Sequence, residues 1–141
     1  MKTTLYKFAG FAGALLLCMV LLAGCGSGSL PLPAWADGEA LTTKAETVLD
    51  DLNAKNYSAV TAHFKEVYRA SLTDESWASQ FTPIFEKTGA FQEYTKTQLL
   101  GTKEDSGVEY AVVLLTAKYE KTSITYRLVF DTDSDLVGLF L

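Results

Sequence analysis

The sequence predicts an α+β domain in which three helices precede and pack on a curved four-stranded antiparallel sheet. Two observations support this class: apolar residues recur with helical spacing across 37–88, and runs rich in Val, Leu, Ile, Thr, Tyr and Phe fill 91–141. A hydrophobic share of 48% is sufficient for a packed core. A chain of 141 residues has room for one such core.

The first two helices are predicted from apolar faces. The first is expected over 37–53, with Leu41, Ala45, Val48, Leu49 and Leu52 on one side. Asn56 is a candidate N-cap for the second helix, because its side-chain oxygen can accept a backbone hydrogen bond. The face of this second helix would carry Tyr57, Val60, Phe64, Val67 and Tyr68.

The third helix is expected to start after Leu72-Thr73, because acidic residues follow in its first turn and negative charge is favourable at a helix N-terminus. Pro83 removes the hydrogen bond to the carbonyl of Ser79, so a kink or a break into two short helices is expected there. Gly89 is expected to end the element.

Four strands are expected at 91–100, 108–119, 123–130 and 136–141, and the short connections between them require an antiparallel meander. Strand 123–130 is expected to be half-buried, because its apolar residues alternate. They are Ile124, Tyr126, Leu128 and Phe130. Strand 108–119 is apolar on both faces, which favours a central position covered on two sides.

The N-terminal residues indicate export. Lys2 and Lys7 precede an apolar run over 8–22, which is the pattern of a secretory signal and is short for a membrane-spanning helix. The run ends in Leu22-Ala23-Gly24-Cys25, which resembles the lipobox of bacterial lipoproteins. We therefore expect a signal peptide over 1–24, and a protein anchored in a bacterial cell membrane, on its extracytoplasmic side, through lipid on Cys25. An uncleaved anchor is the alternative.

After Cys25, a tether rich in Gly, Ser and Pro is expected up to residue 35, followed by the domain over 36–141. Cys18 would leave with the signal peptide and Cys25 would carry lipid, so no disulfide or cysteine-bound metal is expected in the domain. The formal charge of -5 becomes -7 without Lys2 and Lys7, which argues against nucleic acid as a partner.

Several short segments of the domain carry a resemblance to a known family. The segments are Leu52-Asn53-Ala54-Lys55-Asn56-Tyr57 before Phe64, Leu72-Thr73-Asp74-Glu75, Gly89-Ala90-Phe91, and Val129-Phe130-Asp131 leading to Val137-Gly138-Leu139. They resemble the DUF3887 family of small bacterial exported proteins, a branch of the NTF2-like (cystatin-like) cone fold. The resemblance covers about residues 40–141. It implies an NTF2-like cone of helices and curved sheet with no assigned reaction. No cofactor is expected.

No catalytic or metal site is predicted. His63 is the only histidine, and no Gly-x-Ser-x-Gly motif is present to expose a nucleophilic serine. Asp131, Asp133 and Asp135 alternate as in a calcium loop, but the sixth position is Leu136 instead of Gly. A hairpin turn is therefore favoured for these residues.

The cone implied by the resemblance suggests a pocket. Its candidate lining is Trp77, Phe81, Tyr94, Tyr110, Tyr126 and Arg127. Arg127 is expected either to meet an anionic ligand or to pair with Glu93, Glu109 or Glu120 on a neighbouring strand. An aromatic series of this kind is more often core than pocket.

Three functions remain open from the sequence. The first is a non-catalytic binding module for a small ligand in the cone, or for a surface protein on the open sheet face. The alternative is an enzyme resembling ketosteroid isomerase, although no acid is identified among the tyrosines. The third is a homodimer formed through the sheet, suggested by strand 108–119.

Overall fold

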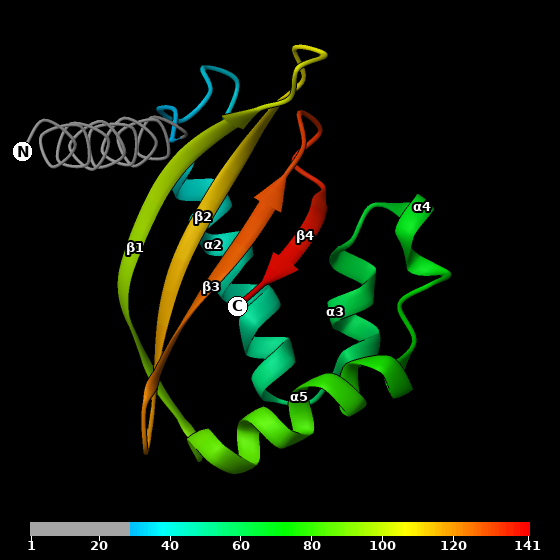
Figure 1. The fold of residues 1–141 in the computed structure, drawn as a ribbon, viewed down its shortest axis with the longest axis vertical. Helices are drawn as coiled ribbons and strands as arrows, with labels where there is room; N and C mark the ends of the chain where they lie inside the picture. Colours follow the sequence, from blue (N-terminus) through cyan, green and yellow to red (C-terminus); the bar gives the residue numbers. More distant parts are fainter. Residues whose placement is uncertain (1–28) are drawn as a thin grey trace, which may run out of the picture. The chain divides into compact units, whose positions relative to one another are not determined.

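The structure is a computed structural model that describes residues 29–141, so the predicted signal peptide and Cys25 lie outside the described residues. Helices α2 (Gly38–Asn53), α3 (Tyr57–His63), α4 (Glu66–Arg69) and α5 (Asp74–Thr88) come first along the chain (Figure 1). Strands β1 (Phe91–Lys103), β2 (Glu109–Tyr119), β3 (Ser123–Phe130) and β4 (Leu136–Phe140) follow. The predicted α+β class is confirmed. None of the helices in residues 29–141 has the length and apolar character needed to cross a membrane.

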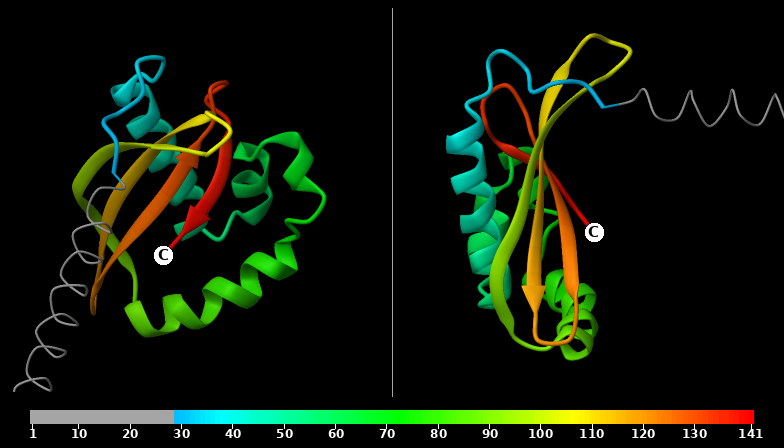
Figure 2. Two further views of the ribbon diagram at one scale, coloured as in Figure 1. Left: turned by 45° about the horizontal axis from the view of Figure 1, so that its top comes forward. Right: turned by 90° about the vertical axis from the view of Figure 1, so that its left-hand side faces the viewer.

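The four strands form one curved antiparallel sheet in the order β1-β2-β3-β4, as the short connections predicted (Figure 2). We call the face toward α2 the inner face and the opposite one the outer face. Residues Val113, Leu115 and Ala117 of β2 point inward and are fully buried with the apolar side of α2. Neighbouring residues on each strand therefore point outward.

Helix α2 forms as the sequence predicted. The side chain of Asp37 accepts hydrogen bonds from the backbone N–H groups of Glu39 and Ala40 at 3.0 and 3.1 Å, which caps the helix N-terminus. All five residues of the predicted apolar face are buried. This helix supplies the main cover of the inner sheet face.

The predicted second helix is shorter than expected, and this is a correction. α3 ends at His63, and Phe64 is extended and forms an isolated parallel bridge with Leu136 at the start of β4. The backbone N–H of Lys65 donates to the carbonyl of Leu136 at 2.9 Å. Because this tertiary pairing satisfies the backbone, the chain leaves the helix and resumes it only in the short α4.

Helix α5 begins and ends where the sequence indicated. The hydroxyl of Thr73 accepts a hydrogen bond from the N–H of Ser76, and Gly89 ends the helix with φ of 77°, a conformation that L side chains rarely adopt. Of the predicted kink or break at Pro83, the break into two short helices is wrong, because the helix continues through this residue. Ser79 and Pro83 both lie on the exposed side, where water can replace the lost partner of the carbonyl.

The segment before α2 packs on the sheet. Leu32, Trp35 and Ala36 are partly buried against the core. A side chain at Gly101 of β1 would meet the carbonyl oxygen of Pro31 at 2.3 Å, so the close approach of this segment requires glycine there. Packing in the domain therefore starts by Leu32, within the residues predicted as tether.

The interior between the helices and the inner sheet face is filled by aromatic rings. Neighbouring rings in this series have centroids 4.8 to 6.1 Å apart. Its members are Phe64, Trp77, Phe81, Phe85, Tyr119, Phe91 and Tyr94. Beside it, the hydroxyl of Tyr119 lies 2.6 Å from that of Tyr126 and donates to the side-chain oxygen of Asn53 at 2.7 Å. Burial raises the pKa of both tyrosines, so both hydroxyls stay protonated.

This hydroxyl network predicts unequal effects for two similar substitutions. Tyr119→Phe leaves both Tyr126 and Asn53 without a partner, so we expect the free energy of unfolding to fall by about 2 kcal/mol. Tyr126→Phe keeps the bond between Tyr119 and Asn53, and we expect a loss of about 1 kcal/mol. Urea unfolding of the two variants checks this order. An equal or larger loss for Tyr126→Phe would contradict the network.

Candidate functional site: a groove on the outer sheet face

Four of the six predicted pocket residues lie inside the domain. Trp77, Phe81 and Tyr126 are buried in the core, and the indole N–H of Trp77 donates to the hydroxyl of Thr61 at 2.9 Å. Tyr94 is half-buried, and its hydroxyl donates to the carboxylate of Asp50 at 2.6 Å. All four side chains lie in the hydrophobic core or pack against it, so they serve as core.

The other two, Tyr110 and Arg127, lie on the outer face. Tyr110 precedes the inward-facing Ala111, and Arg127 lies between the buried Tyr126 and Leu128. Strand alternation therefore directs both away from the cone, and the grouping of all six residues in one pocket is corrected. The predicted partners of Arg127 were Glu93, Glu109 and Glu120. Among the described residues, Arg127 forms no ion pair with any of them.

His63 has an acidic partner that sequence adjacency did not indicate. Its Nε2 lies 2.8 Å from the carboxylate of Asp51 on α2, and both side chains are partly exposed. The nearby Thr43 and Thr47 lie on the same shallow surface, and each hydroxyl donates to a carbonyl of its own helix. The contact between His63 and Asp51 links α2 to α3.

The three aspartates after β3 form the predicted hairpin turn. The N–H of Asp131 donates to the carbonyl of Asp135, and the N–H of Ser134 donates to that of Asp131. One carboxylate oxygen of Asp131 accepts from the N–H groups of Asp133 and Asp135 at 3.0 Å each. We call residues 131–135 the Asp131 turn.

The charge of this turn is balanced by Lys65, which stands between α3 and α4. Its ammonium donates to the second carboxylate oxygen of Asp131 at 2.5 Å and lies 3.7 Å from Asp133. Carboxylate oxygens of Asp131, Asp133 and Asp135 come within 4.8 Å of one another, but both oxygens of Asp131 are already engaged. The ammonium of Lys65 therefore balances part of the negative charge of this turn.

These contacts set the protonation of the pair. Burial works against charge on Asp131, but the hydrogen bond from Lys65 and those from the two backbone N–H groups outweigh it and lower the pKa of this carboxyl. The pKa of Lys65 is raised, chiefly by its hydrogen bond to Asp131. The two groups are therefore an ion pair at neutral pH.

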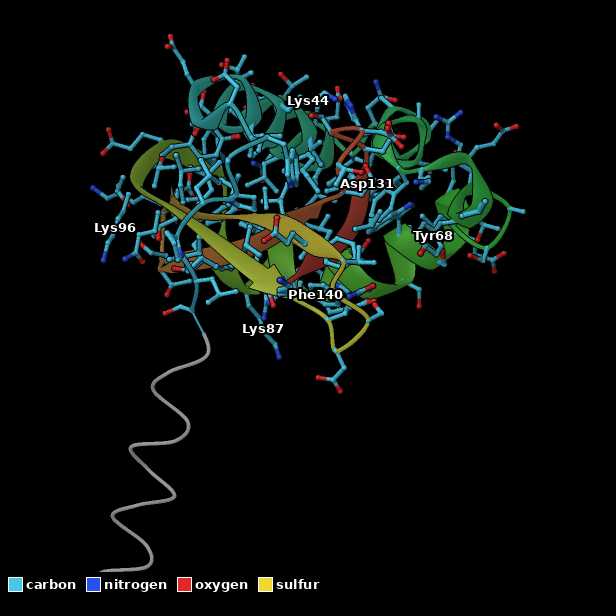
Figure 3. All side chains as sticks on the ribbon, turned by 90° about the horizontal axis from the view of Figure 1, so that it is seen from above. Lys44, Tyr68, Lys87, Lys96, Asp131 and Phe140 are labelled. Atoms are coloured by element: carbon cyan, nitrogen blue, oxygen red, sulfur yellow. The ribbon has the colours of Figure 1, made fainter. Side chains whose placement is uncertain are left out.

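Next to this turn, a groove of about 550 Å³ lies between α4, the β1–β2 hairpin and β4. Its lining side chains are mainly apolar or aromatic. They include Val67 and Tyr68 from α4, Val108 and Tyr110 from the hairpin, and Val129, Val137 and Phe140 from the last two strands. The ring of Phe140 lies over Gly138, where a Cβ atom would meet it at 2.6 Å. Figure 3 labels Tyr68 and Asp131 in the right half of the view and Phe140 near its centre.

The groove gathers most of the large apolar side chains that are exposed on the described surface. Six large apolar residues are exposed in residues 29–141, and four of them line it. They are Val67, Tyr68, Val108 and Phe140, with exposed fractions of 74%, 45%, 44% and 55%. The sequence prediction missed this site because Val67 and Tyr68 were assigned to the buried face of a longer second helix.

Polar groups also line the groove. One is the pair of Lys65 and Asp131. Another is the hydroxyl of Tyr110, which donates to the carboxylate of Glu104 at 3.1 Å, and this bond raises the pKa of the tyrosine. The site offers contact area and hydrogen-bonding groups at its rim, which suits recognition of a partner.

A second cleft of about 580 Å³ lies at the opposite end of the cone. Phe85, Phe91 and Tyr119 form its apolar wall, and Lys55 and Glu86 lie at its edge. The side-chain nitrogen of Asn53 is buried there without a partner in the described residues. Because that atom is closed off from solvent, it offers no donor to a molecule in the cleft.

The fold and the groove together define a small α+β domain with helices on the inner face of a curved antiparallel sheet and an apolar groove on the outer one. The family model of the DUF3887 proteins, a family of unknown function, matches residues 45–139, so the chain belongs to that family. The predicted resemblance to DUF3887 is thereby confirmed. None of the curated proteins matches this chain.

One solved structure extends the likeness to the whole domain. It is an NMR structure of a protein from Ruminococcus gnavus ATCC 29149, with 31% sequence identity and a TM-score of 0.70. The match covers 80% of this chain and 97% of that chain. The fold of this domain is therefore shared with a protein whose structure was determined by experiment.

The ion pair of the Asp131 turn predicts a specific acid sensitivity. Since the folded pKa of Asp131 lies below its unfolded value, its stabilisation is present above about pH 4 and is lost as the pH falls through the folded pKa. At neutral pH, Asp131→Asn should lower the free energy of unfolding by about 1 to 3 kcal/mol, allowing for the partial exposure of Lys65. Urea unfolding between pH 2 and 7 measures both effects.

Asp133→Asn is the matched control, because its side chain is 74% exposed and its oxygen is farther from Lys65. We expect its free energy of unfolding to stay within about 0.5 kcal/mol of the unsubstituted chain. An Asp131→Asn variant that keeps the same acid dependence as the unsubstituted chain would refute the assigned role of the ion pair.

Proposed function

We propose that this chain is an exported lipoprotein, tethered through lipid on Cys25 to the extracytoplasmic face of a bacterial membrane, and that its domain is a non-catalytic module that binds a protein in the groove. The segment Leu22-Ala23-Gly24-Cys25 behind an apolar run supports the tether. Two acyl chains on one cysteine would be enough for stable anchoring.

The convergence of four exposed apolar side chains on one groove carries the binding proposal. Large exposed apolar patches bounded by polar groups mark interaction sites, whereas apolar residues scattered singly over a surface are ordinary. Tyr68 and Tyr110 add aromatic area with a polar tip, which is enriched at protein interfaces.

A ligand inside the cone has less support. The interior is occupied by aromatic side chains from the helices and the sheet, and the hydroxyls of Tyr119 and Tyr126 are bonded to each other. Acid and base chemistry in the cone would need a carboxylate there. In residues 29–141 the one buried carboxylate is Asp131, which lies at the end of the sheet in contact with Lys65.

The tether predicts covalent lipid on one of the two cysteines. In bacteria grown with labelled palmitate, the unsubstituted chain should take up label and sediment with the membranes. Cys25→Ala should lose both properties, because the acceptor thiol is gone. Cys18→Ala is the matched control and should keep both. Label retained by Cys25→Ala would contradict the lipoprotein assignment.

The groove predicts contact with a partner at Phe140. A photoreactive amino acid placed at Phe140 in the full chain, in the producing bacterium, should give one discrete cross-linked product. The same group at Lys87 on α5 is the control and should give none, since it lies away from the groove. Val67→Ser should reduce the product several-fold by removing apolar contact area. Products that are equal at both positions, or absent at both, would oppose binding in the groove.

A further inference from the structure

We propose that the groove takes an extended segment of its partner, with alternating apolar and basic side chains, which adds as a fifth strand to the outer edge of β4. This inference rests on the proposed function, because it names the partner chemistry at the same groove. Three observations carry it: an unpaired strand edge, apolar residues on both sides of that edge, and an excess of acidic residues around it.

The outer edge of β4 is open along most of its length. β4 is the last strand of the sheet and pairs with β3 on one side. On the other side, within residues 29–141, its only bridge joins Leu136 to Phe64. The chain then turns into α4 and leaves the edge of Val137–Phe140 without backbone partners. Such an edge can template pairing with another extended chain.

The chain itself shows that an extended segment fits against this edge. Phe64 has φ of −74° and ψ of 151°, and the N–H of Lys65 donates to the carbonyl of Leu136 at 2.9 Å. This pairing stops after a single bridge because α4 begins at Glu66. A segment from a partner would continue the same pattern along Val137 to Phe140.

Apolar side chains flank the open edge on both sides. Val67 and Tyr68 of α4 lie on one side, and Val137 and Phe140 of β4 line the same groove on the other. Side chains of a strand alternate between its two faces, so an added strand would direct every second side chain into the groove. Those side chains are expected to be apolar.

The other side chains of the partner are expected to be basic. The segments 65–69, 102–110 and 129–141, which supply the groove, contain seven acidic and three basic residues. Two of the three basic side chains are already engaged, Lys65 with Asp131 and Arg69 with the carbonyl of Phe64. Basic groups would be drawn to this surface, whereas a second copy would bring like charges together.

The test uses the full chain with ¹⁵N label in detergent micelles and nine-residue peptides of alternating valine and lysine. We expect this peptide to slow exchange of the amide hydrogens at Val137–Phe140. Two further peptides carry N-methyl groups, one on the valine amides and one on the lysine amides. Because each set of methyl groups blocks one edge of a strand, only one of them should weaken binding, by at least tenfold.

A peptide of alternating valine and glutamate is the charge control, and we expect it to bind at least tenfold more weakly. Val67→Ser should weaken the lysine peptide several-fold without changing the sheet signals away from the groove. Equal binding of the two charge variants would overturn the basic partner. Equal weakening by both methylated peptides, or no protection at Val137–Phe140, would overturn strand addition.

The outcomes separate this inference from the proposed function. If no peptide binds while cross-linking at Phe140 still gives one product, strand addition by a basic segment is wrong and the binding module stands. If light scattering shows that the free chain dimerises with the same amides protected, the occupant is a second copy and the inference is overturned. If neither peptide binding nor cross-linking occurs, both proposals fail.

Discussion

The structure depends on a sheet whose strand β2 is apolar on both faces, although helices cover only one face of the sheet. In β2, Val113 and Leu115 face inward and pack beneath α2, whereas Val112 faces outward. Val112 is nevertheless 3% exposed, and its neighbours across the strands are Leu100 and Val129. Cross-strand side chains can therefore shield the outer face where the sheet is wide and strongly curved.

This shielding ends at the edge of the sheet. β4 has five residues, and α4 approaches it without covering it. At this edge no further strand covers the apolar side chains, so Phe140 of β4 is exposed. Val67 and Tyr68 of α4 are exposed on the other side of the groove. The groove therefore forms because the last strand of the sheet is short and leaves apolar side chains on the outer face uncovered.

The Asp131 turn determines where that edge lies. Asp131 accepts two backbone hydrogen bonds within the turn and one from Lys65, so it fixes the start of β4 and the exit of α3 together. Lys44 of α2 adds a hydrogen bond to the carbonyl of Ser134 at 2.6 Å. Two separate parts of the helical layer are therefore tied to the same five residues.

The sequence was sufficient for most of the fold because the relevant signals are local. Alternation in β3 and the apolar face of α2 follow from spacing alone, and Thr73 and Gly89 mark the ends of α5 by their own chemistry. Tyr126 and Arg127 are neighbours in a strand, so the sequence alone also indicates that they point to opposite faces of the sheet. Grouping them in one pocket ignored that alternation.

The end of α3 and the groove could not be predicted in this way. The chain leaves the helix at Phe64 because Lys65 meets Leu136 and Asp131, partners that are more than sixty positions away in the sequence. No local pattern distinguishes Val67 and Tyr68 as exposed residues, since their spacing continues the apolar face of α3. Tertiary pairing overrode helical periodicity at that point.

The contact between Gly101 and Pro31 limits how far the domain can stand from the proposed lipid anchor on Cys25. Because Pro31 is held against β1, only five residues lie between the packed chain and Cys25. Fully extended, the six peptide units from Cys25 to Pro31 span about 20 Å. With lipid on Cys25, the domain would stay next to the bilayer surface, and a partner in the same membrane would be met by diffusion in two dimensions. Confinement of that kind raises the effective concentration of the partner at the groove, so a partner that pairs only weakly with β4 would still be bound for part of the time.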